Sequence, residues 1–265
     1  MTNKQYARTA EASHWYTRDG EPKHEVDKAD GTGKRPTTAL DAKKLGLLPS
    51  VTNVLGVLAK PTIDTWKTNN ILKAAVELRG KYADDTDEQW TERIQDIADK
   101  PSLEARDFGT AMHKAIEDWL KSHYELWPED ESLWPYLDGF KDWYKKEGLQ
   151  VEGIERTFAL PSQGYAGTAD LMAGGAVVDW KTQNAETEKA LRHYPDWVPQ
   201  IAAYKKAVKA EKAATVAISS KVPGLISINW WKTDELERGY ETFLAARTVF
   251  YGINGKGKNL DGPSK

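Results

Sequence analysis

The spacing of apolar residues changes along the chain, and the changes mark different kinds of secondary structure. Between about residues 62 and 147 the pattern has the three- and four-residue spacing of amphipathic helices. Prolines stand at expected helix starts, Pro61 and Pro101, and glycines at expected helix ends, Gly80 and Gly148. Four helices are predicted in this part, over residues 62–79, 86–99, 101–123 and 130–147.

From residue 151 the pattern changes to short β-rich segments that are separated by turn residues. Strands are predicted over residues 151–160, 164–173, 176–182, 214–220 and 225–232, the last two joined by a turn at Val222–Gly224. Helices are predicted over residues 186–212, with an interruption near 195–199, and over residues 233–251. Together these elements predict an α/β fold: a mixed central sheet of about five strands flanked by helices, preceded by a helical region.

The first 48 residues have no regular period and are predicted to form an arm. We expect a hairpin around Asp19–Gly20 and a polar loop over residues 27–38. The main domain is predicted over residues 49–265, with a helical part at 62–148, a sheet with flanking helices at 151–252, and a loose tail.

The arm contains the glycine-rich sequence GTGKR at residues 31–35, which invites comparison with a phosphate-binding P-loop. The motif requires glycine where this chain has Lys28, and serine or threonine where it has Arg35. The sequence therefore predicts no nucleotide cofactor.

Composition narrows the class of protein. The chain has no run of about 18 apolar residues and begins without the apolar segment of a secretory signal, so we expect a cytoplasmic protein without membrane association. It has no cysteine, which excludes disulfides, thiolate nucleophiles and cysteine-ligated metal centres. The net charge is −3, so a polyanionic partner has to meet a local basic patch or a bound metal ion.

The most apolar stretch of the sequence, residues 164–182, also contains two aspartates and a lysine. A tight turn at Gly174–Gly175 would place Asp170 opposite Asp179, and Thr168 opposite Lys181. Because side chains alternate along a strand, one face of this hairpin is predicted to be core and the other to combine packing with chemistry. The first face carries Ala169, Leu171, Ala173, Ala176, Val178 and Trp180, and the second carries Thr168, Asp170, Met172, Val177, Asp179 and Lys181.

Two carboxylates that face each other across a hairpin repel, so something must compensate. Lys181 offsets part of the charge, and a divalent cation such as Mg²⁺ would offset more. If residues 161–164 form a four-residue loop, Glu155 lies opposite Asp170 and the acidic row spans three strands. The alternative is a solvent-facing sheet with ordinary acid–lysine pairs.

Four short motifs in this region resemble those of the PD-(D/E)xK nucleases, and of their RecB-type exonuclease branch in particular. They are a helical histidine in GTAMH, an aspartate in GTAD, an acid and a lysine in DWK, and a glutamine and a tyrosine in QIAAY. The residues concerned are His113, Asp170, Asp179, Lys181, Gln200 and Tyr204. Residues 48–61 and the helix that begins at Thr62 also resemble phage exonucleases related to the mitochondrial genome-maintenance exonuclease.

The resemblance implies roles for these residues. His113, Asp170, Asp179 and the carbonyl of Trp180 would hold Mg²⁺ or Mn²⁺. Lys181 would act on the attacking water, Gln200 and Tyr204 would line the site or contact DNA, and Glu155 is a weaker candidate for the same site. Glu117 shares a helix face with His113 and is more readily explained as an orienting or surface residue.

Other interpretations of the single residues stay open. A lone helical histidine can be structural, Gln200 and Tyr204 can simply pack, and the lysines near residues 145 and 205 can be solvated rather than bound to phosphate.

The function predicted is a metal-dependent DNA exonuclease that needs no ATP and serves phage recombination, repair or replication in the host cytoplasm. Its partners would be DNA ends, single- or double-stranded, and a single-strand-annealing or recombination protein. The alternatives are an endonuclease of the same fold and a non-catalytic module that binds DNA ends. The opposed aspartates argue against the last, because a binding module has no use for them.

Overall fold

The central element of the computed structural model is a five-stranded sheet, and the structure describes residues 14–80, 82 and 85–254. The strands lie side by side in chain order: β5 (Val151–Leu160), β6 (Tyr165–Ala173), β7 (Ala176–Gln183), β8 (Lys212–Ser219) and β9 (Ile226–Trp230). Only β7 and β8 are parallel, and every other neighbouring pair is antiparallel. The predicted α/β fold with a mixed sheet of about five strands is confirmed.

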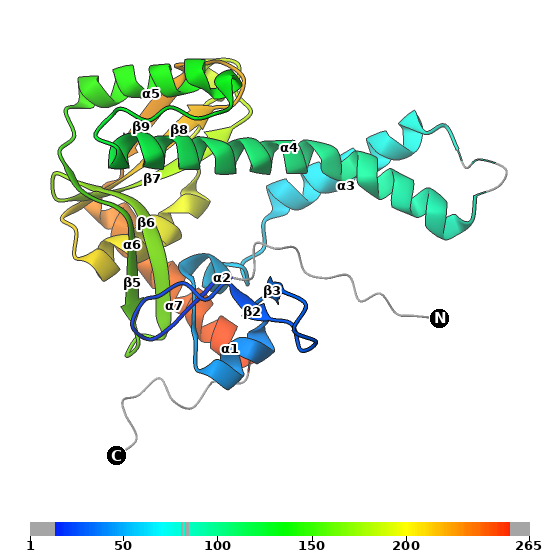
Figure 1. Ribbon diagram of the computed structural model, residues 1–265, viewed down its shortest axis with the longest axis horizontal. Helices are drawn as coiled ribbons and strands as arrows, with labels where there is room; N and C mark the ends of the chain where they lie inside the picture. Colours follow the sequence, from blue (N-terminus) through cyan, green and yellow to red (C-terminus); the bar gives the residue numbers. More distant parts are fainter. Residues whose placement is uncertain (1–13, 81, 83–84, 255–265) are drawn as a thin grey trace.

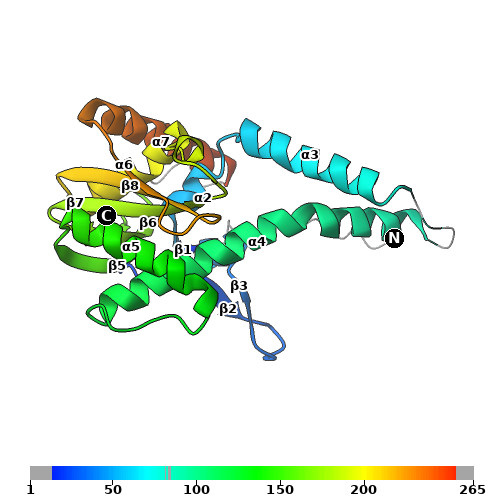
Figure 2. The ribbon, with the colours of Figure 1, turned by 90° about the horizontal axis from the view of Figure 1, so that it is seen from above.

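Helices cover both faces of this sheet (Figures 1 and 2). On one face α4 (Asp87–Lys121) and α5 (Trp134–Glu147) pack Met112, Ile116, Trp119, Leu137 and Phe140 against Leu171, Val178, Trp180, Val216 and Ile218. On the other face α6 (Val198–Val208) and α7 (Thr233–Ile253) pack Ile201, Tyr204 and Phe243 against Tyr165, Ala169, Met172 and Val177. Burial on both faces explains the near-continuous apolar character of β6, β7 and β8.

The alternation of faces predicted for the β6–β7 hairpin is therefore wrong in part. Met172 and Val177 are core residues, in the cluster beneath α6 and α7. Ala169 lies in that same cluster, although it was expected to share a face with Leu171. The strand pattern could not reveal this, because a sheet covered by helices on both sides has no solvent face.

The predicted helix break at Pro101 is also wrong. Thr86 and Gln89 form a capping box, and a single helix then runs from Asp87 to Lys121 with Pro101 inside it. Proline removes one helical hydrogen bond, so the surrounding turns need other support. The part of α4 before Pro101 has that support, because Ile94 and Ala98 pack against Ala74 of α3.

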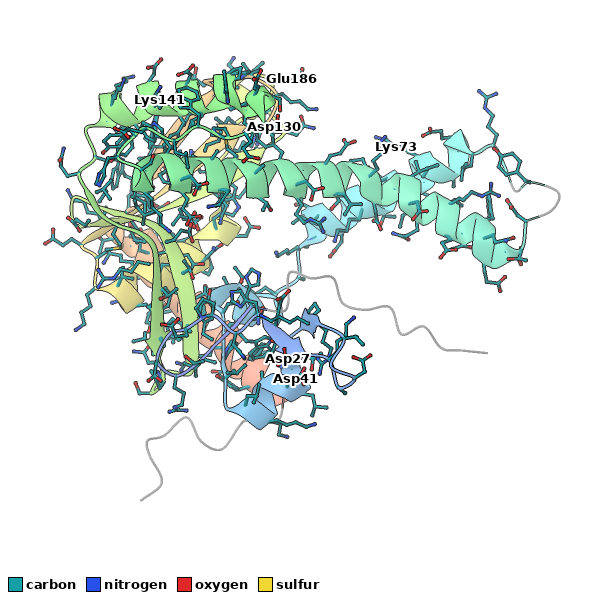
Figure 3. All side chains as sticks on the ribbon, in the orientation of Figure 1. Asp27, Asp41, Lys73, Asp130, Lys141 and Glu186 are labelled. Atoms are coloured by element: carbon teal, nitrogen blue, oxygen red, sulfur yellow. The ribbon has the colours of Figure 1, made fainter. Side chains whose placement is uncertain are left out.

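α3 (Pro61–Glu77) and the first half of α4 form a two-helix projection that extends away from the sheet (Figure 1). Lys73, labelled in Figure 3, lies on this projection. Leu72 and Val76 on the same helix are 59% and 75% exposed, so part of its apolar surface contacts no other described element.

The segment before α3 consists of short elements that pack onto the main core. They are β1 (Trp15–Tyr16), β2 (Glu25–Asp27), β3 (Lys34–Pro36), α1 (Ala39–Leu45), β4 (Leu48–Pro49) and α2 (Val51–Leu55). Trp15, Ala42 and Leu47 join the same apolar cluster as Phe250 and Tyr251 of α7. The proposed domain boundary at residues 48–49 stays a prediction.

Local interactions shape this segment. The expected hairpin around Asp19–Gly20 is a tight turn closed by one antiparallel bridge between Tyr16 and Pro22. The expected polar loop at 27–38 instead contains the β2–β3 hairpin. Asp41, labelled in Figure 3, caps α1 together with Thr38 and forms an ion pair with Arg35.

The connection from β7 to α6 is less helical than predicted. Residues 186–197 hold two 3₁₀ turns, Glu188–Ala190 and Pro195–Trp197, and α6 begins only at Val198. Gln183 and His193 attach this connection to the sheet: Gln183 exchanges hydrogen bonds with the backbone of Arg192, and His193 bridges Thr215 and Ser227. These tertiary contacts outweigh the helical spacing of the apolar residues.

The remaining predictions for the second half of the chain are confirmed. α5 ends at Gly148 in the left-handed conformation, β8 and β9 form an antiparallel hairpin, and α7 follows. Across the described residues, no helix combines the length and the apolar character needed to cross a membrane. The tail that was expected to be loose lies, from residue 255 on, outside the described residues.

Two helical glycines test how closely α5 approaches the β8–β9 turn. A Cβ added at Gly139 would lie 2.3 Å from Cα of Gly224, whereas one at Gly252 meets open space. Alanine is favoured over glycine inside a helix by about 0.5–1 kcal/mol. We expect Gly252→Ala to raise the melting temperature slightly, and Gly139→Ala to lower the stability by about 1–3 kcal/mol through overpacking. Thermal unfolding of both variants checks this, and equal effects would show that α5 is not held against the turn.

Candidate active site

The two strands of the β6–β7 hairpin are no longer paired at the position of their two aspartates. The predicted register holds for Leu171–Val178, Met172–Val177 and Ala173–Ala176, and the ladder then ends. The expected ladder pairs Asp170–Asp179 and Thr168–Lys181 do not form. Instead, the amide of Trp180 donates to Asp170 Oδ2 over 2.8 Å. An opening at this point separates two like charges while keeping them near each other.

The strands of the β5–β6 hairpin change face at the same point. The predicted register of this hairpin is confirmed from Leu160–Tyr165 to Ile154–Leu171, but Glu155 and Asp170, which fall between the pairs Arg156–Ala169 and Ile154–Leu171, do not themselves form a ladder pair. Glu155 has φ of +48°, an unusual value for a residue with a side chain. β5 changes face there, because Phe158 packs beneath α6 and α7 whereas Ile154 packs beneath α4 and α5.

β6 makes the corresponding change of face between Ala169 and Leu171. Regular alternation would have placed these two residues on one side of the sheet. Glu155 and Asp170 therefore lie where the two-stranded β5–β6 ribbon twists and its faces exchange. Unusual backbone conformations of this kind are associated with functional sites.

Helix α4 carries a histidine to this opening. Gly109 of α4 lies so close to β7 that an added Cβ would be 3.0 Å from Thr182 Oγ1. One turn later, His113 Nδ1 lies 3.7 Å from Asp170 Oδ2. The spacing in GTAMH thus has a physical cause: the glycine permits the close approach, and the histidine four residues on uses it.

Asp179 is held from two sides. Its side chain is only 4% exposed and forms an ion pair with Lys181 at 2.5 Å. From α6, Gln200 Nε2 donates to Asp179 Oδ1 over 3.3 Å and to the Tyr204 hydroxyl over 3.0 Å. The i,i+4 pair in QIAAY therefore faces the aspartate of DWK, as the combination of motifs predicts.

The electrostatics of the site show an excess of buried negative charge. Burial raises the pKa of Asp170 to about 6, with a further contribution from the charge of Asp179, while His113 and Lys181 oppose the rise. Burial raises the pKa of Glu155 to about 7, with Asp170 and Glu117 adding to the effect. Burial, followed by the charges of Asp179 and Asp170, also raises the pKa of Tyr204.

These shifts bear on whether the residues fit a metal ion. The site offers carboxylate oxygens and an imidazole nitrogen, which suit Mg²⁺ or Mn²⁺. Burial is the main cause of the raised pKa values of Asp170 and Glu155, and the charges of neighbouring carboxylates come second; a positive charge would offset that second contribution. Within residues 14–80, 82 and 85–254, no three His, Asp or Glu side chains are close enough to hold an ion together. Binding a cation therefore requires side-chain rearrangement around Asp170.

The structure brings the predicted site residues into one region: His113, Glu155, Asp170, Asp179, Lys181, Gln200 and Tyr204. Trp180 contributes its amide to Asp170, and its indole packs against Phe140 and Trp143 in the core. Glu117 forms an ion pair with Lys121 one turn further along α4. The roles of the predicted site residues in metal binding and catalysis stay predictions.

One contact at the site has no counterpart in the sequence analysis. The hydroxyl of Tyr16, in β1, lies 2.9 Å from Thr168 Oγ1, two residues before Asp170. The two residues are 152 positions apart, and no local pattern relates them. Only the folded chain reveals that the N-terminal segment reaches the site.

No protein-family profile and no curated protein sequence matches the chain. Among solved structures, an alkaline exonuclease from Laribacter hongkongensis (LHK-Exo) is similar at 16% identity and a TM-score of 0.33, over 49% of this chain and 72% of that one. The structure of LHK-Exo in complex with dAMP gives 11% identity and a TM-score of 0.36, over 54% and 80%. With TM-scores below 0.5, these similarities do not establish a family, so the resemblance inferred from the motifs stays a prediction.

The raised pKa of Glu155 predicts a dependence of stability on pH in chelator-treated protein. Its pKa rises from 4.5 to about 7 on folding, so the folded chain retains a proton that the unfolded chain has lost. That contribution to stability is complete below pH 4.5 and is lost as the pH rises to about 7. We expect the fall in melting temperature between pH 5 and pH 8 to be smaller in Glu155→Gln than in the parent. Glu237→Gln, at an exposed position of α7, should retain the parent's fall, and an unchanged fall in Glu155→Gln would contradict the prediction.

Proposed function

We propose that this protein is a metal-dependent deoxyribonuclease that degrades DNA from its ends. The observation that carries the proposal is the opening between β6 and β7, where Asp179 is buried beside Lys181 and the side chain of Asp170 is only 12% exposed. Opposed buried carboxylates destabilise a fold unless a cation offsets them. A lysine two residues after one of them is suited to act on a phosphodiester at the same place.

The metal site would consist of His113, Asp170 and Asp179, with the Trp180 carbonyl added by the family resemblance. His113 and Asp170 are already within 3.7 Å, and Asp179 approaches from the neighbouring strand. When bound, Mg²⁺ or Mn²⁺ would neutralise phosphate charge and lower the pKa of a coordinated water.

The protein side chains would divide the remaining tasks. Lys181 is 24% exposed, so its ammonium group is accessible to a substrate while pairing with Asp179. It would orient the attacking water and offset negative charge as the transition state develops. Gln200 and Tyr204 would fix the rotamer of Asp179 through the hydrogen bonds that they already form.

One further feature supports a polyanionic substrate over a small one. Lysines stand in the last turns of two helices that cover the sheet, Lys145 and Lys146 on α5 and Lys205 and Lys206 on α6. Such local patches would supply phosphate contacts that the net charge of −3 does not. The preference for DNA ends, and a role in phage recombination, repair or replication, rest on the resemblance to RecB-type exonucleases.

Digestion of matched DNA substrates tests the proposed function. With Mg²⁺ or Mn²⁺ the parent should degrade end-labelled linear DNA, leave covalently closed circular DNA intact, and stop in chelator. Lys181→Ala should reduce cleavage by about 100-fold or more because it removes a group that stabilises the transition state. Lys189→Ala, at an exposed position, serves as the control. Cutting of circles would indicate an endonuclease, and no cutting of either substrate would contradict the proposal.

Thermal unfolding tests the metal site independently of cleavage. Mg²⁺ or Mn²⁺ should raise the melting temperature of the parent, in proportion to the logarithm of its concentration above the Kd. Asp170→Asn removes one of the repelling charges and keeps an oxygen acceptor for the Trp180 amide. At pH 8 in chelator we expect this variant to melt at or above the parent's temperature, to gain little from added metal, and not to cut DNA. A large loss of stability in chelator would mean that Asp170 has a structural rather than a metal-binding role.

A further inference from the structure

The N-terminal segment of the chain contributes a residue to the candidate active site. Where β7 separates from β6, the backbone of Ser50 forms a parallel bridge to Ala166. Tyr16 and Leu48, from the paired strands β1 and β4, pack directly on Ala166. The β1–β4 pair therefore lies against the part of β6 that leads to Asp170.

Exposure along β6 singles out one residue besides Asp170. In this strand of nine residues, seven residues are buried, and only Thr168 and Asp170 are partly accessible. They are two residues apart, so their Cα atoms are about 7 Å apart. This is close to the spacing of neighbouring phosphates along an extended DNA strand.

The position of Thr168 is fixed from both sides of β6. At the preceding residue, a Cβ on Gly167 would lie 2.8 Å from the ring of Phe158 and 3.3 Å from that of Tyr204, so glycine is required there. On the other side, the Tyr16 hydroxyl forms its 2.9 Å hydrogen bond to Thr168 Oγ1. The sequence GTAD thus holds a hydroxyl in a defined place beside the aspartate.

The direction of that hydrogen bond determines what the threonine can do. Tyr16 is only 4% exposed, and burial raises the pKa of its phenol, with a smaller contribution from the charge of Glu155. Geometry alone allows either hydroxyl to donate. The buried phenol has no water to accept its proton, whereas the partly exposed threonine hydroxyl has, so we assign Tyr16 as the donor and Thr168 Oγ1 as the acceptor. The proton of the Thr168 hydroxyl is then available to a partly exposed surface beside the site, where it can donate to an anionic oxygen.

We propose that Thr168 is a DNA-contacting residue, whose hydroxyl donates to a backbone phosphate next to the one that is cleaved, and that Tyr16 is its positioning residue. The inference rests on the proposed function for its substrate class and adds a binding group to the site. It also gives the N-terminal segment a role: β1 carries the phenol that orients this contact.

A double-mutant cycle on DNA binding tests the proposal without cleavage. The probe is fluorescently labelled linear DNA, and its affinity is measured by anisotropy in chelator and again in Ca²⁺. Thr168→Val and Tyr16→Phe each remove one hydroxyl and should weaken binding about 2- to 10-fold, the effect of one net hydrogen bond. Because Tyr16 acts through Thr168, the double variant should bind no more weakly than Thr168→Val alone.

Two control variants separate this role from a structural one. Tyr251→Phe removes another buried hydroxyl that bonds to the same β5–β6 hairpin, at Gly164 O, away from the carboxylates. It should lower stability about as much as Tyr16→Phe while leaving the affinity for DNA unchanged. Thr168→Ser keeps the hydroxyl and should retain most of the parent's affinity, which keeps the test valid even if Tyr16→Phe unfolds.

The outcomes distinguish this inference from the proposed nuclease activity. Additive losses would overturn the positioning role of Tyr16, and unchanged binding in Thr168→Val would overturn the phosphate contact. A parent that binds DNA but never cuts it would contradict the nuclease proposal while leaving the contact intact. A parent that does not bind DNA under either condition would contradict both.

Discussion

The repulsion among Asp170, Asp179 and Glu155 is the constraint on which the architecture of the site depends. These carboxylates lie on three consecutive strands, in a region with little solvent to screen them. An uninterrupted antiparallel ladder would have placed Asp170 directly against Asp179. Instead the ladder between β6 and β7 ends just before that pair, and the Asp170 carboxylate accepts the Trp180 amide. The end of the β6–β7 ladder and the cluster of carboxylates thus belong together, and a cation is the simplest group that would offset the repulsion.

The elements around the opening are adapted to it in different ways. α4 reaches it because Gly109 permits a close approach to Thr182. α6 supports it through the hydrogen bonds of Gln200 to Asp179 and Tyr204. The N-terminal strands pack where β6 lacks β7 as a neighbour, and Tyr16 meets Thr168 there. Three parts of the chain, distant in sequence, therefore meet at the opening between β6 and β7.

The two faces of the sheet have distinct tasks. Beneath α4 and α5 the aromatic contacts of Trp180 with Phe140 and Trp143 make a rigid support for the strand that carries Asp179 and Lys181. Beneath α6 and α7 the core contains Tyr204, whose hydroxyl joins the polar network of the site. Rigid packing on both sides holds the repelling groups in place, since a looser sheet would let them move apart.

Much of the fold and the candidate site followed from local sequence patterns. The Gly174–Gly175 turn predicted the first three pairs of the β6–β7 ladder, and the four-residue loop after Leu160 predicted the β5–β6 register, in which Glu155 and Asp170 fall between two ladder pairs. Both features depend on neighbouring residues and turn chemistry, which sequence encodes directly. Tertiary packing decided the rest. Contacts with α3 support the part of α4 before Pro101, so no break forms there, and the contacts of Gln183 and His193 replaced a predicted helix with 3₁₀ turns. The splaying of the hairpin and the meeting of Tyr16 with Thr168 depend on charges and surfaces that come together only when the chain folds, and no local pattern contains them.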